Sequence, residues 1–381
     1  FELHQNGSVA SSTSSDADFN VQAVAVAHIP VTLTRGPYLQ MGNETAFTVR
    51  WRTNVASDSK LELGTVYGTY PIVVTDPAQV TEHEVRVTIA AYGDCVQNSN
   101  GYQTGALASY RNYLNTIGLK AADMMILIGD NAYNSGTDNE YQTGFFNAYQ
   151  SNILKNHMLF PAPGNHDYSN GSSARQVDKA IPYYSIFTMP TNGECGGVPS
   201  GTEAFYSFDR GDVHILSLDS YGKENSGTTR LYDTLGAQVQ WIKADLAANT
   251  KKWVIAYWHH PPYTMGSHNS DNEGELSSMR QNFIRILERY GVDVIICGHS
   301  HDYERSYLMK GHYGNEASFN VAAHAVDNSS AKYDGSSNSC PYTTPSGRIE
   351  HGTVYVVSGS SGASGGVQSG YPHNAMPFSI N

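Results

Sequence analysis

The strongest constraint on the fold of this chain is a series of short apolar runs, each followed at once by residues that can bind a metal ion. The last run, residues 292–296, is followed by Cys297-Gly298-His299-Ser300-His301. Short apolar runs bounded by turn residues predict buried strands, and Gly298 allows the backbone to turn where the strand stops. Neutral imidazoles are the commonest metal ligands in proteins, so this turn indicates part of a metal site.

Four earlier apolar runs end in the same way. They are followed by Gly93-Asp94, Gly129-Asp130, Gly164-Asn165-His166-Asp167 and His259-His260-Pro261-Pro262. Any one of these motifs alone is an ordinary turn, but five in succession are not independent accidents. Carboxylate, amide and imidazole groups together suit a pair of hard and borderline cations. A carboxylate such as that of Asp130 can bridge two ions about 3.5–4 Å apart.

Helical patterns separate the apolar runs over most of the chain. They cover residues 105–119, 141–155, 236–248 and 275–290, and further strands are expected at 204–208, 213–218, 253–258 and 352–358. This alternation predicts an α/β (α+β) domain over residues 89–381, with the sheet inside and the helices outside. Ligands of such domains gather at the carboxyl ends of the strands, so we expect the five motifs to meet there.

Residues 30–88 have a different pattern, in which short alternating runs are separated by Pro, Gly and Asn. This pattern predicts a small all-β sandwich whose core contains Trp51. Residues 1–29 are a polar segment rich in Ser, Asn and Asp. A sandwich of about 55 residues is short beside the ~100 that are typical, and it runs into the next domain without a linker. We therefore expect a stretch of chain to be missing between Thr88 and Ile89.

The composition bears on partners and location. There are 23 Lys and Arg against 35 Asp and Glu, and no basic run is present, which argues against nucleic acid as a partner. No apolar stretch approaches the roughly 18 residues that indicate a transmembrane helix. The low charge, the 26 tyrosines and a first residue other than Met favour a processed, secreted or extracytoplasmic protein. Sequons that would carry glycans in a eukaryotic secretory pathway begin at Asn6, Asn43, Asn170 and Asn328.

Four cysteines are too few for a disulfide scaffold in a chain of 381 residues. Cys195 and Cys340 lie in polar loops, where the sequence leaves a disulfide between them open. Cys95 and Cys297 lie at the ends of apolar strands, and we expect them to be buried thiols.

The motifs together resemble the calcineurin-like metallophosphoesterase superfamily, and more closely the purple acid phosphatases. Val96 stands where the broader superfamily has a metal-binding histidine, whereas Tyr133 follows Asp130 by three residues, as in purple acid phosphatases. The run His299-Ser-His-Asp-Tyr-Glu-Arg305 is similar to that family, as is Arg35-Gly-Pro-Tyr-Leu-Gln40 near the N-terminus. The resemblance implies a metallophosphoesterase sandwich of mixed sheets flanked by helices, preceded by a fibronectin-III-like domain.

The resemblance also implies two metal ions, an Fe(III) and a divalent ion that is Zn, Mn or Fe. Asp130 would bridge them. The remaining ligands would be Asp94, Tyr133 and His301 for the iron, and Asn165, His259 and His299 for the divalent ion.

From the residues alone, His260 competes with His259 as the fourth-motif ligand, although the spacing to Pro261 and Tyr263 favours His259. His166 and His268 would line the substrate pocket, and Tyr133 would give the iron site its purple colour. We read His157, His214, His312, His324 and His351 as structural or surface residues.

The implied activity is that of an acid phosphatase, in which a metal-bound hydroxide attacks the phosphorus of a small phosphate monoester. His268, if protonated, can give a proton to the leaving alkoxide, and His166 can stabilise the phosphate oxygens. Two alternatives stay open. One is a phosphodiesterase or nucleotide hydrolase that uses the same site, and the other is a surface protein with a vestigial site. The natural substrate and the oligomeric state do not follow from the sequence.

Overall fold

The computed structural model describes residues 2–5, 8–11, 20–25, 31–40, 46–64, 72–88, 124–149, 154, 158–169, 173–224, 229–331, 340–344, 351–360 and 366–380. Several sequence predictions fall outside these residues. They are the ligand Asp94, the thiol of Cys95, the strand at 89–92, the helix at 105–119, the junction at Ile89 and the sequons at Asn6, Asn43 and Asn170.

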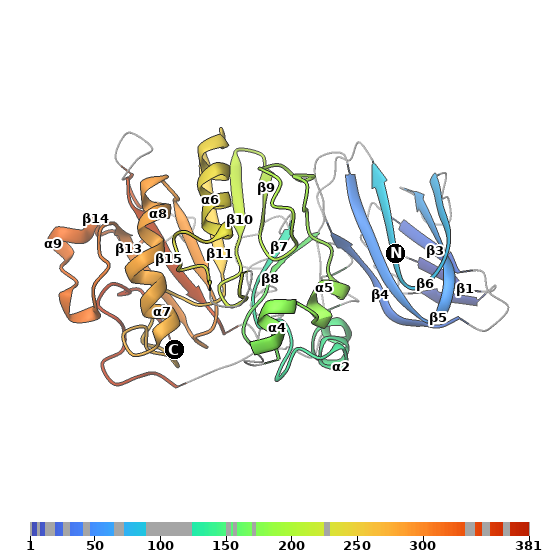
Figure 1. Cartoon of the computed structure of the whole chain (residues 1–381), viewed down its shortest axis with the longest axis horizontal. Helices are drawn as coiled ribbons and strands as arrows, with labels where there is room; N and C mark the ends of the chain where they lie inside the picture. Colours follow the sequence, from blue (N-terminus) through green and yellow to red (C-terminus); the bar gives the residue numbers. More distant parts are fainter. Residues whose placement is uncertain are drawn as a thin grey trace. The chain divides into compact units, whose positions relative to one another are not determined.

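The chain divides into two compact units. The first comprises Phe1–Ile126, Asp138–Phe160 and Ile186–Met189, and the second comprises Leu127–Thr137, Pro161–Ser185 and Pro190–Asn381. An N-terminal β-sheet region is thus followed along the chain by mixed α/β structure (Figure 1), and the predicted fold class is confirmed. The predicted domain limits after residues 29 and 88 stay predictions.

The first unit is built on an eight-stranded sheet with the order β2-β1-β3-β5-β4-β8-β7, in which β6 also pairs with β5. The last two residues of β7 and of β8 belong to the second unit. The strands of this eight-stranded sheet are β1 Glu2–Gln5, β2 Ser8–Ser11, β3 Asn20–Ala25, β4 Leu33–Gln40, β5 Ala46–Gly64, β6 Ile72–Thr88, β7 Met124–Ile128 and β8 Met158–Ala162.

The long antiparallel pair of β5 and β6 differs from the short separate strands that the sequence predicts. The register of this pair shifts between Arg52 and Ser57 and again before Ser59. Such irregularities interrupt the alternation of inward and outward side chains while the strand continues, so the pattern alone breaks the strand into pieces. Trp51 is 1% exposed, which confirms its predicted place in the core.

A short helical segment covers an aromatic cluster of the first unit. It consists of α2 Asp138–Glu140, a π-helical turn Tyr141–Phe146 and α3 Asn147–Tyr149. The ring of Phe146 lies 4.9 Å from that of Tyr38 and 6.4 Å from that of Phe187. The buried guanidinium of Arg35 lies over Phe146 and pairs with Asp138 at 2.9 Å, so its charge is balanced within the cluster.

The second unit contains a seven-stranded mixed sheet with the order β14-β13-β15-β12-β11-β10-β9. Strands β10, β11, β12 and β15 are parallel, so their carboxyl ends share one edge. The strands are β9 Tyr206–Arg210, β10 Val213–Ser217, β11 Trp253–Trp258, β12 Val294–Cys297, β13 Tyr303–Met309, β14 Ala325–Asp327 and β15 Thr353–Ser358. The sequence patterns missed β13 and β14, which pair antiparallel at the edge of the sheet opposite β9.

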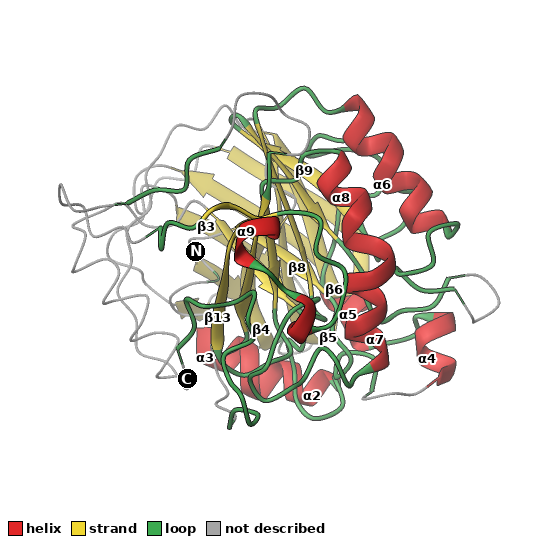
Figure 2. Cartoon of the chain, turned by 90° about the vertical axis from the view of Figure 1, so that its left-hand side faces the viewer, coloured by secondary structure: helices red, strands yellow, loops and turns green. Residues whose placement is uncertain are grey.

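Two helical segments lie along one face of this sheet (Figure 2). The first is α6 Ala237–Ala248, and the second runs from α7 Gly274–Ser278 through a π-helical turn Met279–Phe283 to α8 Ile284–Arg289. Both match the helices predicted at 236–248 and 275–290. Their buried apolar side chains form one core with those of the central strands, which keeps the strand ends in fixed positions. Shorter helices are α4 Ser173–Asp178, α5 Pro182–Ile186 and α9 Val321–His324.

The cysteines and the surface bear on the remaining sequence predictions. Cys195 and Cys340 do not form the disulfide that the sequence left open, and Cys340 Sγ lies 3.2 Å from Ser330 Oγ. Cys297 is a buried thiol, as predicted.

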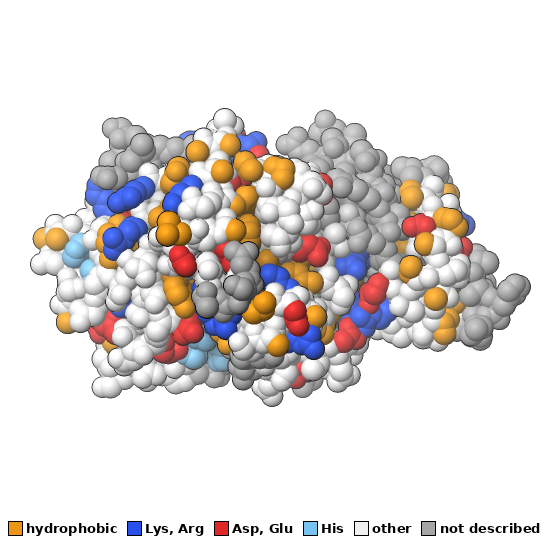
Figure 3. Space-filling view, viewed as in Figure 1, with side chains coloured by type: hydrophobic (Ala, Val, Ile, Leu, Met, Phe, Trp, Pro, Cys, Tyr) orange, Lys and Arg blue, Asp and Glu red, His pale blue; other side chains and the backbone are white. Residues whose placement is uncertain are grey.

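On the face in Figure 3, the lysines and arginines are divided among several small groups. Within the described part of the chain, no helix is long and apolar enough to cross a membrane.

His214 on β10 is buried between two carboxylates of the second unit. Its Nδ1 lies 2.8 Å from Asp209 Oδ1, and its Nε2 lies 2.7 Å from Asp245 Oδ2. Asp245 also accepts hydrogen bonds from Ser207 Oγ and the Val198 amide, which fits an ionised carboxylate. Burial lowers the pKa of His214, but the hydrogen bonds and charges of Asp245 and Asp209 outweigh it and raise this pKa above its ordinary value.

We expect His214→Gln to lower the free energy of unfolding by about 3 kcal/mol at pH 5.5, because it leaves Asp245 buried without its cation. A raised folded-state pKa makes the contribution of His214 fully present below the unfolded value of about 6.5. It is lost as the pH rises through the folded-state pKa. Urea unfolding at pH 5.5 and pH 9 measures the difference in the free energy of unfolding between wild type and His214→Gln. This difference should be smaller at pH 9.

His324→Gln serves as the control, since the ring of His324 lies among the rings of His312 and Phe319 rather than between carboxylates. The prediction is wrong if the free energies of unfolding of wild type and His214→Gln differ by the same amount at both pH values.

Candidate metal centre

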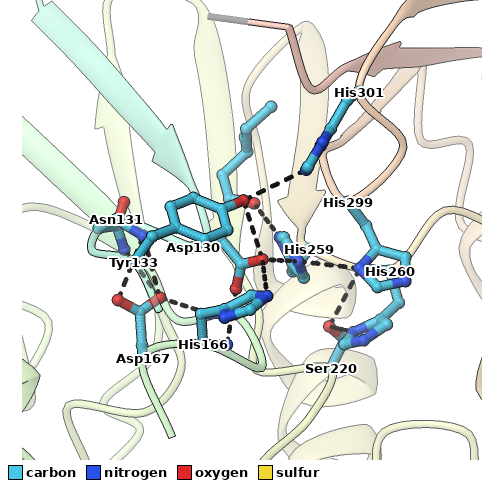
Figure 4. Close-up of polar contacts among 12 residues, drawn as sticks. Asp130, Asn131, Tyr133, His166, Asp167, Ser220, His259, His260, His299 and His301 are labelled. Atoms are coloured by element: carbon cyan, nitrogen blue, oxygen red, sulfur yellow. Dashed lines mark hydrogen bonds and ion pairs between the residues drawn. The ribbon is translucent and has the colours of Figure 1, made fainter. Parts of the chain in front are cut away.

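Four strand ends of the second unit bring the predicted motifs to one place (Figure 4). Asp130 follows β7, and His166 follows β8 within the Gly164-Asn165-His166 turn. His259 follows β11, whereas His299 and His301 follow β12. This convergence is what the strand-end pattern of the sequence predicts for these motifs. The first predicted ligand, Asp94, lies outside the described residues.

Glycines stand where the ligand side chains pack directly on the backbone. A Cβ atom on Gly129 would lie 2.6 Å from His259 Nδ1, and one on Gly164 would lie 2.3 Å from Asp130 Oδ1. Both separations are far below van der Waals contact. Gly129 also has a φ of +90°, a conformation that only glycine adopts without strain. The glycines of these motifs therefore make room for the ligands.

Two predicted ligands have a left-handed backbone conformation. Asp130 has a φ of 51° and His299 a φ of 67°, although neither is a glycine. Such conformations are sparsely populated by residues with a side chain and persist only where the surroundings enforce them. Here they turn the side chains of Asp130 and His299 away from the strand direction and into the site (Figure 4).

The carboxylate of Asp130 is at the centre of the cluster. Its Oδ2 lies 3.0 Å from His259 Nε2, accepts a hydrogen bond from Tyr133 Oη at 3.2 Å and lies 3.9 Å from His166 Nε2. Its Oδ1 accepts the His166 backbone amide at 2.8 Å. Burial raises the pKa of Asp130, but His259 and His166 outweigh burial and hold this pKa well below its usual range. Asp130 is therefore an anion at any working pH.

The ring nitrogens of His259 and His299 face each other. His259 Nδ1 donates to the Ile128 carbonyl at 3.0 Å, so Nε2 is the nitrogen directed into the site. His299 Nδ1 lies 3.2 Å from that Nε2. Burial lowers the pKa of His299 to about 4, so its imidazole is neutral and able to act as a ligand. Two imidazole nitrogens and a carboxylate oxygen directed at one place are a donor set that fits a cation.

Tyr133 and His301 form the other side of the cluster. Tyr133 Oη lies 3.4 Å from His301 Nε2, in addition to its contact with Asp130. Burial and the charge of Asp130 raise the pKa of Tyr133 above its ordinary value, so the phenol keeps its proton when no cation faces it. The His301 backbone amide donates to Ser267 Oγ at 2.9 Å, which ties this ligand loop to the loop that carries His268.

His259, rather than His260, faces Asp130. His260 is also buried, and its Nδ1 lies 2.9 Å from Ser220 Oγ while its ring stacks on Tyr221 at 5.4 Å. Nitrogens of His259, His260 and His299 nevertheless lie close enough together to hold one ion. The geometry favours His259 as the ligand that is shared with Asp130, in agreement with the sequence spacing.

The two predicted substrate residues border the same cluster. His166 Nδ1 donates to the Asn134 carbonyl at 2.6 Å, and its Nε2 points towards Asp130. The ring of His268 stacks on that of His299 with centroids 3.8 Å apart. Asn165 lies between Gly164 and His166 on the same turn, and its Oδ1 is buried.

Two functional residues were missed by the sequence reasoning. Asp167 is fully buried, and its Oδ2 accepts the Gly164 amide at 2.7 Å and the Asn131 side-chain amide at 3.2 Å. It thus joins the loops that carry Asp130 and His166. Its position at the end of the Gly164-Asn165-His166-Asp167 motif is the sequence feature that could have indicated its part in the site. The second residue is Glu273, which contacts His268 and carries no signal in the sequence beyond its charge.

Comparisons with known proteins bear on this arrangement. The profile of the calcineurin-like phosphoesterase family matches residues 87–303. Over 227 residues, the chain is 30% identical to an uncharacterised protein of Mycobacterium tuberculosis strain H37Rv, covering 57% of this chain and 36% of that one. Over 158 residues, it is 30% identical to purple acid phosphatase 15 of Arabidopsis thaliana, covering 41% and 26%. The chain thus spans about a third or less of the length of these two relatives.

A shorter relative is covered more fully. Tartrate-resistant acid phosphatase type 5 of Rattus norvegicus is 24% identical over 241 residues, which are 59% of this chain and 69% of that one. Among solved structures, purple acid phosphatase PPD1 from yellow lupin seeds has a TM-score of 0.54 at 15% identity, covering 90% of this chain and 67% of that one. PhoD has a TM-score of 0.55 at 12% identity, covering 87% and 77%. These two structures share the fold of this chain.

We expect Gly164→Ala to displace the Asp130 carboxylate, because the new Cβ would lie 2.3 Å from Asp130 Oδ1 and 2.4 Å from its backbone nitrogen. Loss of an outer partner of a ligand weakens metal binding roughly 10–100-fold, and displacing the ligand itself should weaken it at least as much. Zinc titration of metal-depleted protein measures the change.

Gly144→Ala is the matched control, because a Cβ at Gly144 meets no atom within 4 Å. Zinc affinity equal to wild type in a folded Gly164→Ala protein shows that the prediction is wrong.

Proposed function

The chain belongs to the calcineurin-like phosphoesterase family and is related to the purple acid phosphatases, and from this premise we propose that it is a metal-dependent acid phosphatase. The observation that carries the proposal is the convergence of His259, His299 and Tyr133 on the Asp130 carboxylate. We propose small phosphate monoesters as its substrates. The place of the Asp130 carboxylate between two ligand sets supports hydrolysis by paired cations.

The proposed metal ligands divide around Asp130. Tyr133 and His301, together with Asp94, would hold Fe(III), whereas His259, His299 and Asn165 would hold a divalent Zn, Mn or Fe ion. The contact between Tyr133 Oη and His301 Nε2 supports the first set, and the facing nitrogens of His259 and His299 support the second. When bound, such ions polarise a phosphoryl group and lower the pKa of water.

The protein's own groups have separate tasks in this proposal. His166 has its Nδ1 fixed by the Asn134 carbonyl, so its Nε2 is available to the oxygens of a bound phosphate. His268 has its Nδ1 held by Glu273, so its Nε2 is available to give a proton to the leaving alkoxide.

The test of this function is hydrolysis of p-nitrophenyl phosphate and bis-p-nitrophenyl phosphate by protein loaded with iron and zinc, followed from pH 4 to pH 9. We expect turnover of the monoester, with the higher rate on the acidic side because Fe(III) is a strong Lewis acid. Preference for the diester would instead assign a phosphodiesterase or nucleotide hydrolase. A fully loaded protein that hydrolyses neither ester would overturn the enzyme proposal.

The two histidines of the 298–301 turn should differ in their effects. Since we assign His301 to the iron beside Tyr133, His301→Ala is expected to abolish the visible absorption of the iron-loaded protein. His299→Ala is expected to keep that absorption and to weaken zinc binding at least roughly 10-fold. Absorption spectra and zinc titration measure the two effects separately. Equal loss of colour in both variants would contradict the assignment.

We also propose an extracytoplasmic location. The support is compositional, namely the low share of charged residues and the 26 tyrosines. Fractionation of cells that produce the full natural protein tests it, and recovery from the cytosol alone would count against it.

A further inference from the structure

We propose that Glu273 is a positioning residue that holds the metal ligand His299 and the proton donor His268 in a fixed relation. The inference rests on the proposed function for the roles of the two histidines. Its geometric basis does not depend on that function, since all three side chains are in direct contact in the structure.

One carboxylate contacts both imidazoles. His268 Nδ1 lies 3.0 Å from each oxygen of Glu273, and His299 Nε2 lies 3.7 Å from Glu273 Oε2. The two rings are stacked with centroids 3.8 Å apart and an angle of 28° between their planes. Glu273 therefore borders the edge of both rings at once, and movement of one ring is resisted by the other.

The two nitrogens of His299 have different partners. Nδ1 faces His259 Nε2 at 3.2 Å, on the side of Asp130, whereas Nε2 faces Glu273. A carboxylate behind a ligating imidazole keeps the proton on the outer nitrogen and makes the inner nitrogen a better donor to a cation. Glu273 Oε2 lies 3.7 Å from His299 Nε2, beyond hydrogen-bond length, so it acts on that proton through its charge.

The same carboxylate sets the orientation of His268. Because His268 Nδ1 donates to Glu273, the Nε2 of that ring is the nitrogen left for substrate. The His268 backbone amide lies 3.4 Å from Ser300 Oγ, next to the ligand turn. The orientation of His268 is thus set by Glu273, which also contacts the ligand His299, and by Ser300 in the ligand turn.

Glu273 is itself fixed by its own loop. Its Oε1 accepts the Asn269 amide at 2.9 Å, and its backbone amide donates to the Asn269 carbonyl at 3.2 Å. The Ser277 amide donates to the Glu273 carbonyl, which anchors the residue at the start of α7. A side chain held at both its backbone and its carboxylate can hold its neighbours in turn.

The loop that leads to His268 is also anchored. The Met265 amide donates to Glu304 Oε1 at 3.0 Å, and the Gln368 amide donates to the Met265 carbonyl at 3.0 Å. Ser267 Oγ accepts the His301 amide. With the loop fixed on three sides, a change at Glu273 should act on the two imidazoles without unfolding the loop.

The experiment compares Glu273→Gln with Glu275→Gln, a matched loss of one acidic group two residues further along the chain, in the first turn of α7. The first measurement is zinc titration of metal-depleted protein, which needs no activity. We expect Glu273→Gln to weaken zinc binding about 10–100-fold, as for other carboxylates behind a ligating imidazole. Glu275→Gln should bind zinc as wild type does. The visible absorption of iron-loaded protein should be retained, since the polar contacts of the Glu273 carboxylate in the described structure are with His268, Asn269 and His299.

The second measurement reports on His268. p-Nitrophenolate leaves without a proton, whereas the leaving phenolate of phenyl phosphate benefits from one. We expect Glu273→Gln to lower kcat for phenyl phosphate about tenfold more than kcat for p-nitrophenyl phosphate. In a His268→Ala background, Glu273→Gln should add nothing to this selective loss. Glu273→Asp, which keeps the charge, should restore part of the zinc affinity.

Three outcomes overturn the proposal. The first is a folded Glu273→Gln protein with the zinc affinity of wild type. The second is that, in the His268→Ala background, Glu273→Gln still lowers kcat for phenyl phosphate more than kcat for p-nitrophenyl phosphate. The third is that Glu273→Gln binds one zinc ion fewer than wild type. The last outcome would mean that His268, Glu273 and His299 themselves hold a further cation, which their spacing allows. If wild type binds zinc but hydrolyses neither ester, the proposed function fails, and zinc affinity alone decides whether Glu273 positions His299.

Discussion

The contact between the Asp130 carboxylate and His259 Nε2, at 3.0 Å, is the interaction on which the rest of the site depends. It joins the end of β7 to the end of β11, and the side chains of His259 and Asp130 are only 1% and 4% exposed. A buried carboxylate is costly unless positive or hydrogen-bond-donating groups face it. The surrounding imidazoles and the Tyr133 phenol meet this need, and the same groups are the ones that can bind a cation.

The site is a small rigid assembly because each ligand loop is tied to another. Asp167 joins the loops after β7 and β8, and Ser267 joins the His301 turn to the His268 loop. Glycines at positions 129 and 164 let these loops approach so closely that a single added methyl group would collide with a ligand. A site assembled in this way has little freedom to adjust, which suits a reaction that needs fixed distances between groups.

The sequence predicted the strand ends well because apolar runs that stop at glycine leave little choice of local structure. The helices at 236–248 and 275–290 and the strands before Asp130, His166, His259 and His299 are where the pattern placed them. The pattern failed for the long β5–β6 pair, where shifts of register break the alternation. It also failed for β13, since its charged and aromatic residues look like a surface segment although Glu304 is fully buried. In both cases, contacts with neighbouring strands override the local signal.

What the sequence determined by itself is the set of donor groups and their attachment to the ends of strands. Only the tertiary structure decided that His259 rather than His260 faces Asp130, and which nitrogen of each ring is directed into the site. Those choices depend on the Ile128 and Asn134 carbonyls, which lie 131 and 32 residues along the chain from His259 and His166. The role of Glu273 was decided in the same way. The physical reason is that the hydrogen-bond partner of an imidazole fixes its orientation, and spacing along the sequence does not specify that partner.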